Sequence, residues 1–270
     1  MRLAGLSEKT QSDYVGAVFR LSKYYARSPD QLEDEEIRRW FVHLSDERGL
    51  APSTLRVYIY GTKFFYQHTL GREVPVLDFV KAQKVIRLPE ALTHEQVCRV
   101  LEQVREPTYH MALCLTYACG LRRKEVCNLT VDAVNGTLLT VHIRRSKGNK
   151  DRYVPLPGPV YKALRAYWAA KRPPKPWLFV NRVGKPLNPE VLNTAFKKAL
   201  AQSPVEKKAT LHILRHSYAT TMLQTGASVY QLMACLGHGS LTSTVRYLHL
   251  LQGDDIPFRK ALDGLMSDLF

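Results

Sequence analysis

The sequence predicts a mainly α-helical fold with a small β-hairpin, divided into two domains. Most of the chain places apolar residues three and four positions apart, which is the period of an amphipathic helix. Residues 138–156 instead alternate apolar and polar residues on both sides of a Lys-Gly-Asn turn, as the strands of a hairpin do. A basic segment, residues 81–89, has no helical period and ends in proline, so we place the domain boundary there.

The first domain, residues 1–80, is predicted to be a small helical bundle. Its first helix is expected over residues 7–25, with an apolar stripe that comprises Tyr14, Val15, Val18, Phe19, Ser22 and Tyr25. A second amphipathic helix is expected over residues 34–47. A third begins at about Pro52, because proline followed by serine suits the first turn of a helix.

The second domain, residues 90–270, is predicted to combine helices with the hairpin in an α+β arrangement. Residues 93–104 and 109–120 have helical patterns, and a short strand is expected at residues 177–180. Helices are expected again from there to the C-terminus. The basic linker 81–89 has the character of an extended tether that lies on DNA.

The chain carries a large excess of positive charge. Lys and Arg number 39 against 24 Asp and Glu, which gives a formal net charge of +15, so nucleic acid is the expected partner. No run of about 18 apolar residues occurs, and the N-terminus turns polar before a signal peptide could form, so we expect neither membrane association nor secretion. The five cysteines form no C-x-x-C pair, which is typical of reduced, buried thiols in a cytoplasmic protein.

Residues 210–221, TLHILRHSYATT, place two histidines and an arginine in one predicted helix. The apolar stripe of this helix comprises Leu211, Leu214, Tyr218 and Met222. His212 and Arg215 stand beside it on adjoining turns, so a polar partner is expected for them. His212 and His216 also have the spacing of a helical zinc pair, but no Glu follows His212 and no Cys or acidic ligand lies nearby. We therefore favour packing or a local hydrogen bond for His216 over a metal site.

Four other polar residues each have an ordinary structural explanation when taken alone. Arg122 is explained as a surface arginine paired with Glu125 one turn later. Lys147 fits a solvated hairpin tip, His238 fits a helix terminus, and Tyr247 fits a core position.

Together, these residue types form the set needed to cleave a phosphodiester without a metal. The set comprises Arg122, Lys147, His212, Arg215, His238 and Tyr247. Guanidinium groups grip non-bridging phosphate oxygens through paired N–H bonds and neutralise charge that develops in the transition state. A lysine can protonate the departing oxygen, and a tyrosine, whose free pKa is about 10, can attack phosphorus when a neighbouring histidine takes its proton.

Four motifs around these residues are similar to those of the tyrosine recombinases, also called the phage integrase family. GLRRKE resembles the family's G-L-R-x-x-E segment at Arg122, and KGNKDRYVPL resembles the hairpin of the catalytic lysine at Lys147, although Ser146 replaces the glycine often found before it. HILRHSYAT matches H-x-x-R-H-S-x-A-T, and LGHGSLTSTVRY matches L-G-H-x-S followed by a tyrosine. The resemblance covers nearly the whole chain, since residues 1–80 resemble the family's SAM-like core-binding domain.

The resemblance implies a mechanism in which the tyrosine attacks a DNA phosphodiester and leaves a 3′-phosphotyrosyl bond and a free 5′-hydroxyl. Exchange of strands then passes through a Holliday junction. The implied roles are a phosphate clamp for Arg122 and Arg215, protonation of the leaving oxygen for Lys147, proton removal for His212, a phosphate hydrogen bond for His238 and nucleophilic attack for Tyr247. No nucleotide, metal or other cofactor is implied, because the bond energy is kept in the protein–DNA link.

The resemblance also implies partners. Expected are a double-stranded recombination site and a homo-tetramer on two duplexes, built from chains that are monomers in free solution and lie in the cytoplasm, on the nucleoid when bound to DNA. The apolar segment 256–270 is expected to dock on a neighbouring protomer, or else to fold back on its own core. The chain resembles a simple two-domain member of the Xer-like, integron-like or transposon-associated kind.

Two other functions are compatible with the same residues. A type IB topoisomerase uses similar chemistry but reseals the same strand, and a non-catalytic protein binds DNA without cleaving it. The LGHGS segment and the two-domain length favour recombination over relaxation. The target DNA sequence and the biological role are left open, because base readout depends on side-chain positions that motif spacing does not fix.

Overall fold

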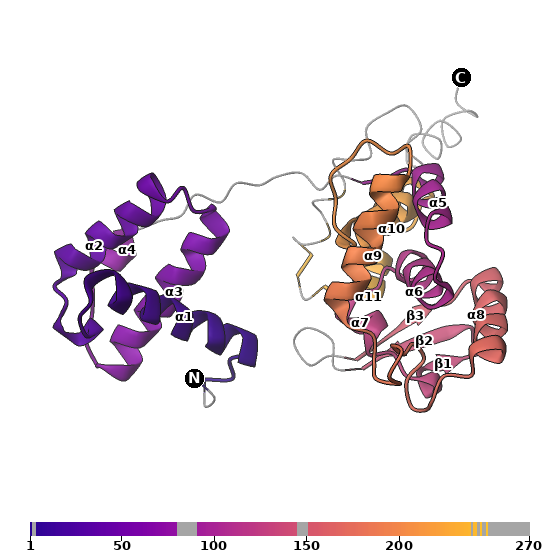
Figure 1. Ribbon diagram of the computed structural model, residues 1–270, viewed down its shortest axis with the longest axis horizontal. Coiled ribbons are helices and arrows are strands. Elements are labelled where there is room, and N and C mark those ends of the chain that lie inside the picture. The colour runs from indigo at the N-terminus through magenta and orange to yellow at the C-terminus, as the bar shows by residue number, and fades with distance from the viewer. Residues whose placement is uncertain are drawn as a thin grey trace, which may run out of the picture. The chain divides into compact units, whose positions relative to one another are not determined.

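A computed structural model describes residues 1, 4–79, 91–144 and 151–238, together with Ser240, Leu241, Thr244 and Tyr247. The predicted linker 81–89, Lys147 and the C-terminal segment 256–270 therefore lie outside the described residues. The chain divides into two compact units, Met1–Arg87 and Leu88–Phe270 (Figure 1).

The first unit is the predicted helical bundle. Its elements are α1 (Glu8–Tyr25), the 3₁₀ turn η1 (Pro29–Gln31), α2 (Asp34–Val42), the π turn η2 (His43–Glu47), α3 (Pro52–Thr69) and α4 (Val76–Phe79). Polar side chains cap the helix starts, since Ser7 accepts from the backbone N–H of Thr10 and Glu33 forms a capping box with Glu36. Pro52 occupies the first turn of α3, as predicted.

Helices α1 and α3 pack closely through a glycine. A Cβ atom at Gly61 of α3 would lie 2.9 Å from the Cα atom of Tyr14 of α1, so the two backbones approach to a distance that excludes a side chain there. The small Ala17 faces the same contact and is buried. The apolar stripe predicted for α1 is therefore wrong in part, because this rotation of the helix leaves Val15 and Phe19 exposed by 57% and 66%.

The second unit combines helices with a small antiparallel sheet, as predicted. Its elements are α5 (His94–Glu102), α6 (Pro107–Ala118), α7 (Arg123–Cys127), η3 (Val131–Ala133), β1 (Val134–Asn135), β2 (Thr140–Ile143), β3 (Arg152–Pro155), α8 (Gly158–Lys171), α9 (Pro189–Gln202), α10 (His212–Gln224) and α11 (Val229–Leu236). Helix α6 contacts α5, α7, α8, α9 and α10. It is apolar around most of its circumference, which suits the central helix of a core.

The predicted hairpin is formed by β2 and β3. Val141 lies opposite Val154 in the antiparallel register, and both side chains are buried together with Ile143. A third strand, β1, pairs with the other edge of β2. Figure 1 shows this sheet at one end of the unit, beside the label of α8.

The strand predicted at residues 177–180 is wrong. Trp177 and Val180 make only isolated bridges, to Thr130 and Pro186 respectively. The apolar residues of this segment serve a loop that packs on the core, because Leu178 and Phe179 are consecutive and both are buried. A strand covered on one face would bury only alternate residues.

Candidate active site

Arg215 lies in the interior of the second unit, on α10. Its side chain is 2% exposed, and it donates hydrogen bonds from Nη1 to the carbonyl oxygen of Gly120 (2.7 Å) and from Nη2 to that of Leu236 (2.6 Å). Burial, and then the positive charge of Arg122, lower the pKa of Arg215 to about 9. The group is still cationic at neutral pH, and an anion bound beside it would favour its charged form.

Gly120 supplies the bend that carries its carbonyl group to Arg215. Its φ angle is +59°, in the left-handed region that favours glycine, and a Cβ atom there would lie 2.5 Å from Cδ1 of Tyr218. The glycine of the GLRRKE segment is therefore required by both backbone conformation and packing.

Arg122 lies at the start of α7 and bonds a buried carboxylate. Its Nη1 donates to Oε1 of Glu125 (2.7 Å), its backbone N–H donates to Oε2 of Glu125 (2.8 Å), and its Nη2 donates to the carbonyl oxygen of Gly237 (3.0 Å). The predicted pairing of Arg122 with Glu125 is confirmed, but its placement on the surface is wrong. The Arg122 side chain is only 21% exposed and that of Glu125 only 8%.

A second arginine, Arg152 of β3, holds the same carboxylate. Its Nη1 and Nη2 donate to Oε1 and Oε2 of Glu125 at 2.9 and 2.7 Å. Burial raises the pKa of Glu125, but the hydrogen bonds and charge of Arg152, followed by the hydrogen bonds from Arg122, outweigh burial and lower the pKa to about 2. The sequence predicts no role for Arg152, although this residue stands in the KGNKDR segment that resembles the family motif.

Two histidines of α10 lead from the surface to the tyrosine. His212 is exposed, and its ring meets that of His216 edge to face with 4.8 Å between ring centroids. Nδ1 of His216 lies 2.7 Å from the hydroxyl oxygen of Tyr247, whose side chain is 1% exposed. This hydrogen bond differs from the local one expected for His216, because its partner stands 31 positions further along the chain.

His238 follows the end of α11. Its backbone N–H donates to the carbonyl oxygen of Met233, which confirms the predicted helix terminus. Its ring Nδ1 lies 2.7 Å from Oγ1 of the buried Thr244.

The end of α11 brings the arginines together. The carbonyl oxygens of two consecutive residues, Leu236 and Gly237, accept from Arg215 and Arg122, and His238 comes next in the chain. Three of the six candidate residues therefore converge on one helix terminus, while Tyr247 and His212 are joined through His216. Lys147, the sixth, lies outside the described residues, in the segment between β2 and β3.

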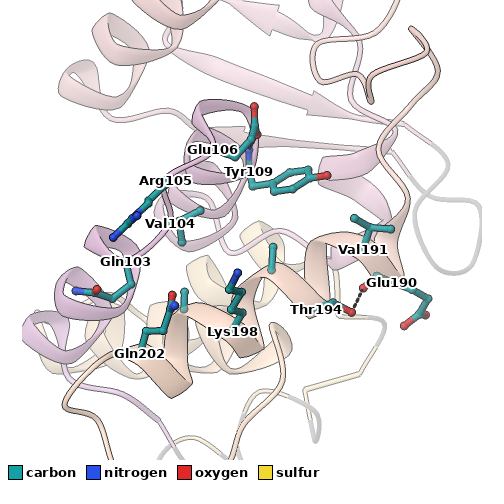
Figure 2. Close-up of a pocket in the computed structure, with 12 residues that line it drawn as sticks. Gln103, Val104, Arg105, Glu106, Tyr109, Glu190, Val191, Thr194, Lys198 and Gln202 are labelled. Atoms are coloured by element: carbon teal, nitrogen blue, oxygen red, sulfur yellow. Dashed lines mark hydrogen bonds between the residues drawn. The ribbon is translucent and has the colours of Figure 1, made fainter.

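A metal cluster and a surface pocket are the other kinds of candidate site. No group of three or more His, Cys, Asp or Glu side chains within the described ranges is placed to hold a metal ion. A surface pocket of about 610 Å³ lies between the α5–α6 turn and α9 (Figure 2), where Arg105, Glu106 and Lys198 are among its lining residues. None of the six candidate residues lines this pocket.

Among the helices that the structure describes, none has the length and apolar character to span a membrane.

Both parts of the chain match known protein families. The profile of the Phage integrase family matches residues 90–253, and that of the Phage integrase, N-terminal SAM-like domain matches residues 1–76. The chain belongs to the phage integrase family. Members of this family are also called tyrosine recombinases, and their reaction is the site-specific cleavage and rejoining of DNA.

Relatives in this family match most of the chain. An integrase/recombinase of Sinorhizobium fredii is 34% identical over 252 residues, which are 93% of this chain and 82% of the relative. The tyrosine recombinase XerD of Halalkalibacterium halodurans is 29% identical, covering 91% of this chain and 88% of its own length. The Tn1549 transposon integrase, solved in complex with transposon right end DNA, has the same fold, with a TM-score of 0.71 at 19% identity over 98% of this chain and 94% of that one.

Proposed function

We propose that the protein is a site-specific recombinase that cleaves and rejoins DNA strands through a 3′-phosphotyrosyl intermediate. The observation that carries this proposal is the pair of guanidinium groups of Arg215 and Arg122, which bond the neighbouring carbonyl groups of Leu236 and Gly237. Two arginines fixed in this way suit the two non-bridging oxygens of one phosphate. Such fixed donors stabilise the charge that develops on phosphate during attack.

The proposed reaction keeps the energy of the cleaved phosphodiester bond in a phosphotyrosyl bond. The phenolic oxygen of Tyr247 forms a bond to phosphorus while the bond from phosphorus to the 5′-oxygen breaks. His212 takes the phenolic proton, Lys147 gives a proton to the leaving 5′-oxygen, and His238 hydrogen-bonds the phosphate. The 5′-hydroxyl of another strand then attacks the phosphotyrosyl link, restores the free tyrosine and produces a Holliday junction.

The proposed nucleophile begins the reaction in a buried position. The Tyr247 hydroxyl contacts His216 at 2.7 Å, and its side chain is 1% exposed. Attack on DNA therefore requires the tyrosine to leave this contact, which makes cleavage dependent on a rearrangement that DNA binding has to drive. The ring of His212 lies against that of His216, so the proposed proton acceptor is next to the place that the tyrosine leaves.

The proposed partners are a double-stranded recombination site and further copies of the chain. The net charge of +15 supports a DNA partner, as does the structure of the similar Tn1549 integrase in complex with transposon right end DNA. Exchange between two duplexes requires four cleavages, so the proposed assembly is a homo-tetramer that forms on DNA from monomers.

Replacement of the proposed nucleophile tests the chemistry. We expect Tyr247→Phe to abolish the covalent adduct with a nicked suicide DNA substrate while DNA binding is retained, because only the attacking oxygen is removed. Denaturing gel electrophoresis measures the adduct and a mobility shift measures binding. An adduct that persists in the variant would show that another residue attacks.

A Holliday junction substrate separates the proposed recombinase from a topoisomerase. A recombinase resolves the junction into exchanged duplexes, whereas an enzyme that reseals the same strand relaxes supercoiled DNA and yields no exchanged product. A protein that binds the site but gives neither product nor adduct would be a non-catalytic DNA-binding protein.

A further inference from the structure

Arg152 is the first residue of β3, and its side chain is almost fully buried, with 8% exposed. Its two terminal nitrogens bond both oxygens of Glu125, and its Nε donates to the carbonyl oxygen of Cys235 at 2.7 Å. A cation of this kind is favoured at the C-terminal end of a helix, where the carbonyl groups of α11 have no partners within the helix.

These bonds place three arginines on three consecutive peptide groups. Cys235 accepts from Arg152, Leu236 accepts from Arg215, and Gly237 accepts from Arg122. The three donors come from β3, α10 and the start of α7. Arg152 is therefore the member of this group that connects the end of α11 both to Glu125 and to the strand after Lys147.

The backbone next to Arg152 is shaped to receive it. Gly237 has a φ angle of +62°, and a Cβ atom there would lie 2.9 Å from Cδ of Arg152. The side chain thus packs against a bare backbone, where even a methyl group would displace it.

Arg152 also controls how Glu125 meets Arg122. Because it binds both carboxylate oxygens in a planar fork, it fixes the plane of the carboxyl group. The side chain of Arg122 then bonds Oε1 through Nη1, while its Nη2 bonds Gly237. If Arg152 were absent, the carboxylate would still accept the bonds from Nη1 and the backbone N–H of Arg122. The carboxylate could then turn and draw the guanidinium of Arg122 away from Gly237.

We propose that Arg152 is a positioning residue for the cleavage reaction, which holds Glu125 and the end of α11 so that Arg122 is presented to the DNA phosphate. This proposal rests on the proposed function only in taking Arg122 as a phosphate ligand. In this proposal Arg152 acts on Arg122 through Glu125 and the backbone of α11, and not on the phosphate directly.

Arg152→Lys is the decisive variant, because lysine keeps the charge but cannot bond both oxygens of Glu125 and the Cys235 carbonyl group in the same planar geometry. At saturating suicide substrate we expect the rate of adduct formation to fall by at least about tenfold, since small displacements of a catalytic group are costly. The affinity for DNA should remain close to that of the unmodified chain, whereas the thermal unfolding midpoint should fall because a buried carboxylate loses hydrogen bonds. The rate is therefore measured at a temperature at which the variant is folded. Full activity of the lysine variant, or a loss of rate that only follows a loss of binding, would overturn the proposal.

Hydrogen exchange measured by mass spectrometry provides a readout that needs no activity. Arg152→Gln should speed backbone exchange both at residues 232–238 and at residues 120–127, the two segments that Arg152 joins. Arg144→Gln is the matched control, because Arg144 also bonds a carboxylate, that of Asp132, but both side chains are exposed. Unchanged exchange in Arg152→Gln, or the same change in the control, would overturn the proposal. If the unmodified chain gives no adduct, the proposed function fails, and the exchange comparison still decides whether Arg152 holds the two segments.

Discussion

Glu125 shows how a single buried carboxylate can organise a cationic site. Arg122 and Arg152 surround it with hydrogen bonds, and its side chain is 8% exposed. Removing one partner of such a group leaves the others buried and uncompensated, so each of the three residues depends on the other two. The arrangement explains why an acidic residue belongs in a site that is proposed to bind phosphate.

The depressed pKa of Glu125 predicts an acid-dependent contribution to stability. The pKa falls from its ordinary value of 4.5 to about 2 in the fold. Because the folded value is the lower one, the contribution is complete above about pH 5 and is lost as the pH falls toward 2. Glu125→Gln should therefore lower the free energy of unfolding by roughly 3 kcal/mol at pH 7 and by clearly less at pH 3.

Urea unfolding at several pH values measures this difference. Glu102→Gln, at the exposed end of α5, serves as the control for loss of a carboxylate. A destabilisation by Glu125→Gln that is the same at pH 7 and pH 3 would contradict the assignment of its charged form to the fold.

The sequence predicts individual residues where they belong to a motif or to helical spacing. It does not predict contacts that depend on how distant parts of the chain fold together. The pairing of Arg122 with Glu125 follows from helical spacing. The bond between His216 and Tyr247 does not, because it joins residues 31 positions apart and depends on how the chain returns after α11. Arg152 was missed because a hairpin arginine carries no signal of burial, and its partners lie on two other elements.

At the scale of elements, the glycine before Leu121 is predicted to matter more than an ordinary turn glycine. Gly120 and Gly184 both have positive φ angles, of +59° and +75°. An added Cβ at Gly184 would meet only Pro174 at 3.5 Å, whereas at Gly120 it would lie 2.5 Å from Tyr218. Gly184→Ala should therefore cost about 1 kcal/mol for backbone strain alone, and Gly120→Ala should cost roughly 3 kcal/mol because overpacking is added.

Chemical denaturation of the two variants measures this difference. We also expect Gly120→Ala to impair adduct formation, because the carbonyl group of Gly120 holds Arg215. Equal destabilisation by the two substitutions would indicate that the ring of Tyr218 moves aside at little cost.

Elements were predicted well where periodicity was long, and poorly where a tertiary contact decided the outcome. The hairpin follows from strict alternation around a polar turn. The positions of apolar residues do not predict the buried face of α1. Its close contact with α3 is made at Gly61 and the small Ala17, and this orientation leaves Phe19 exposed. Residues 177–180 form a loop whose apolar side chains pack on the core. Composition alone does not distinguish such a loop from a buried strand.

The whole molecule is predicted to bind DNA mainly through phosphates. Its charge of +15 favours contacts that release counterions, and binding of this kind weakens steeply with salt. If each chain makes about six to ten phosphate contacts, its affinity for a duplex should fall by about 10³ to 10⁵ between 50 and 200 mM salt. Fluorescence anisotropy with a labelled duplex measures the slope, and an affinity that hardly changes over this range would contradict phosphate-dominated binding.

The three consecutive carbonyl groups at the end of α11 also restrict which substitutions, insertions and deletions this chain can accept during evolution. Side chains at positions 235 and 236 can be exchanged without touching the acceptors, which belong to the backbone. Inserting or deleting one residue just before Cys235 would rotate all three peptide groups about the helix axis and uncouple all three arginines in a single step. We therefore expect a substitution at position 235 to be tolerated far more readily than a change in the length of this segment.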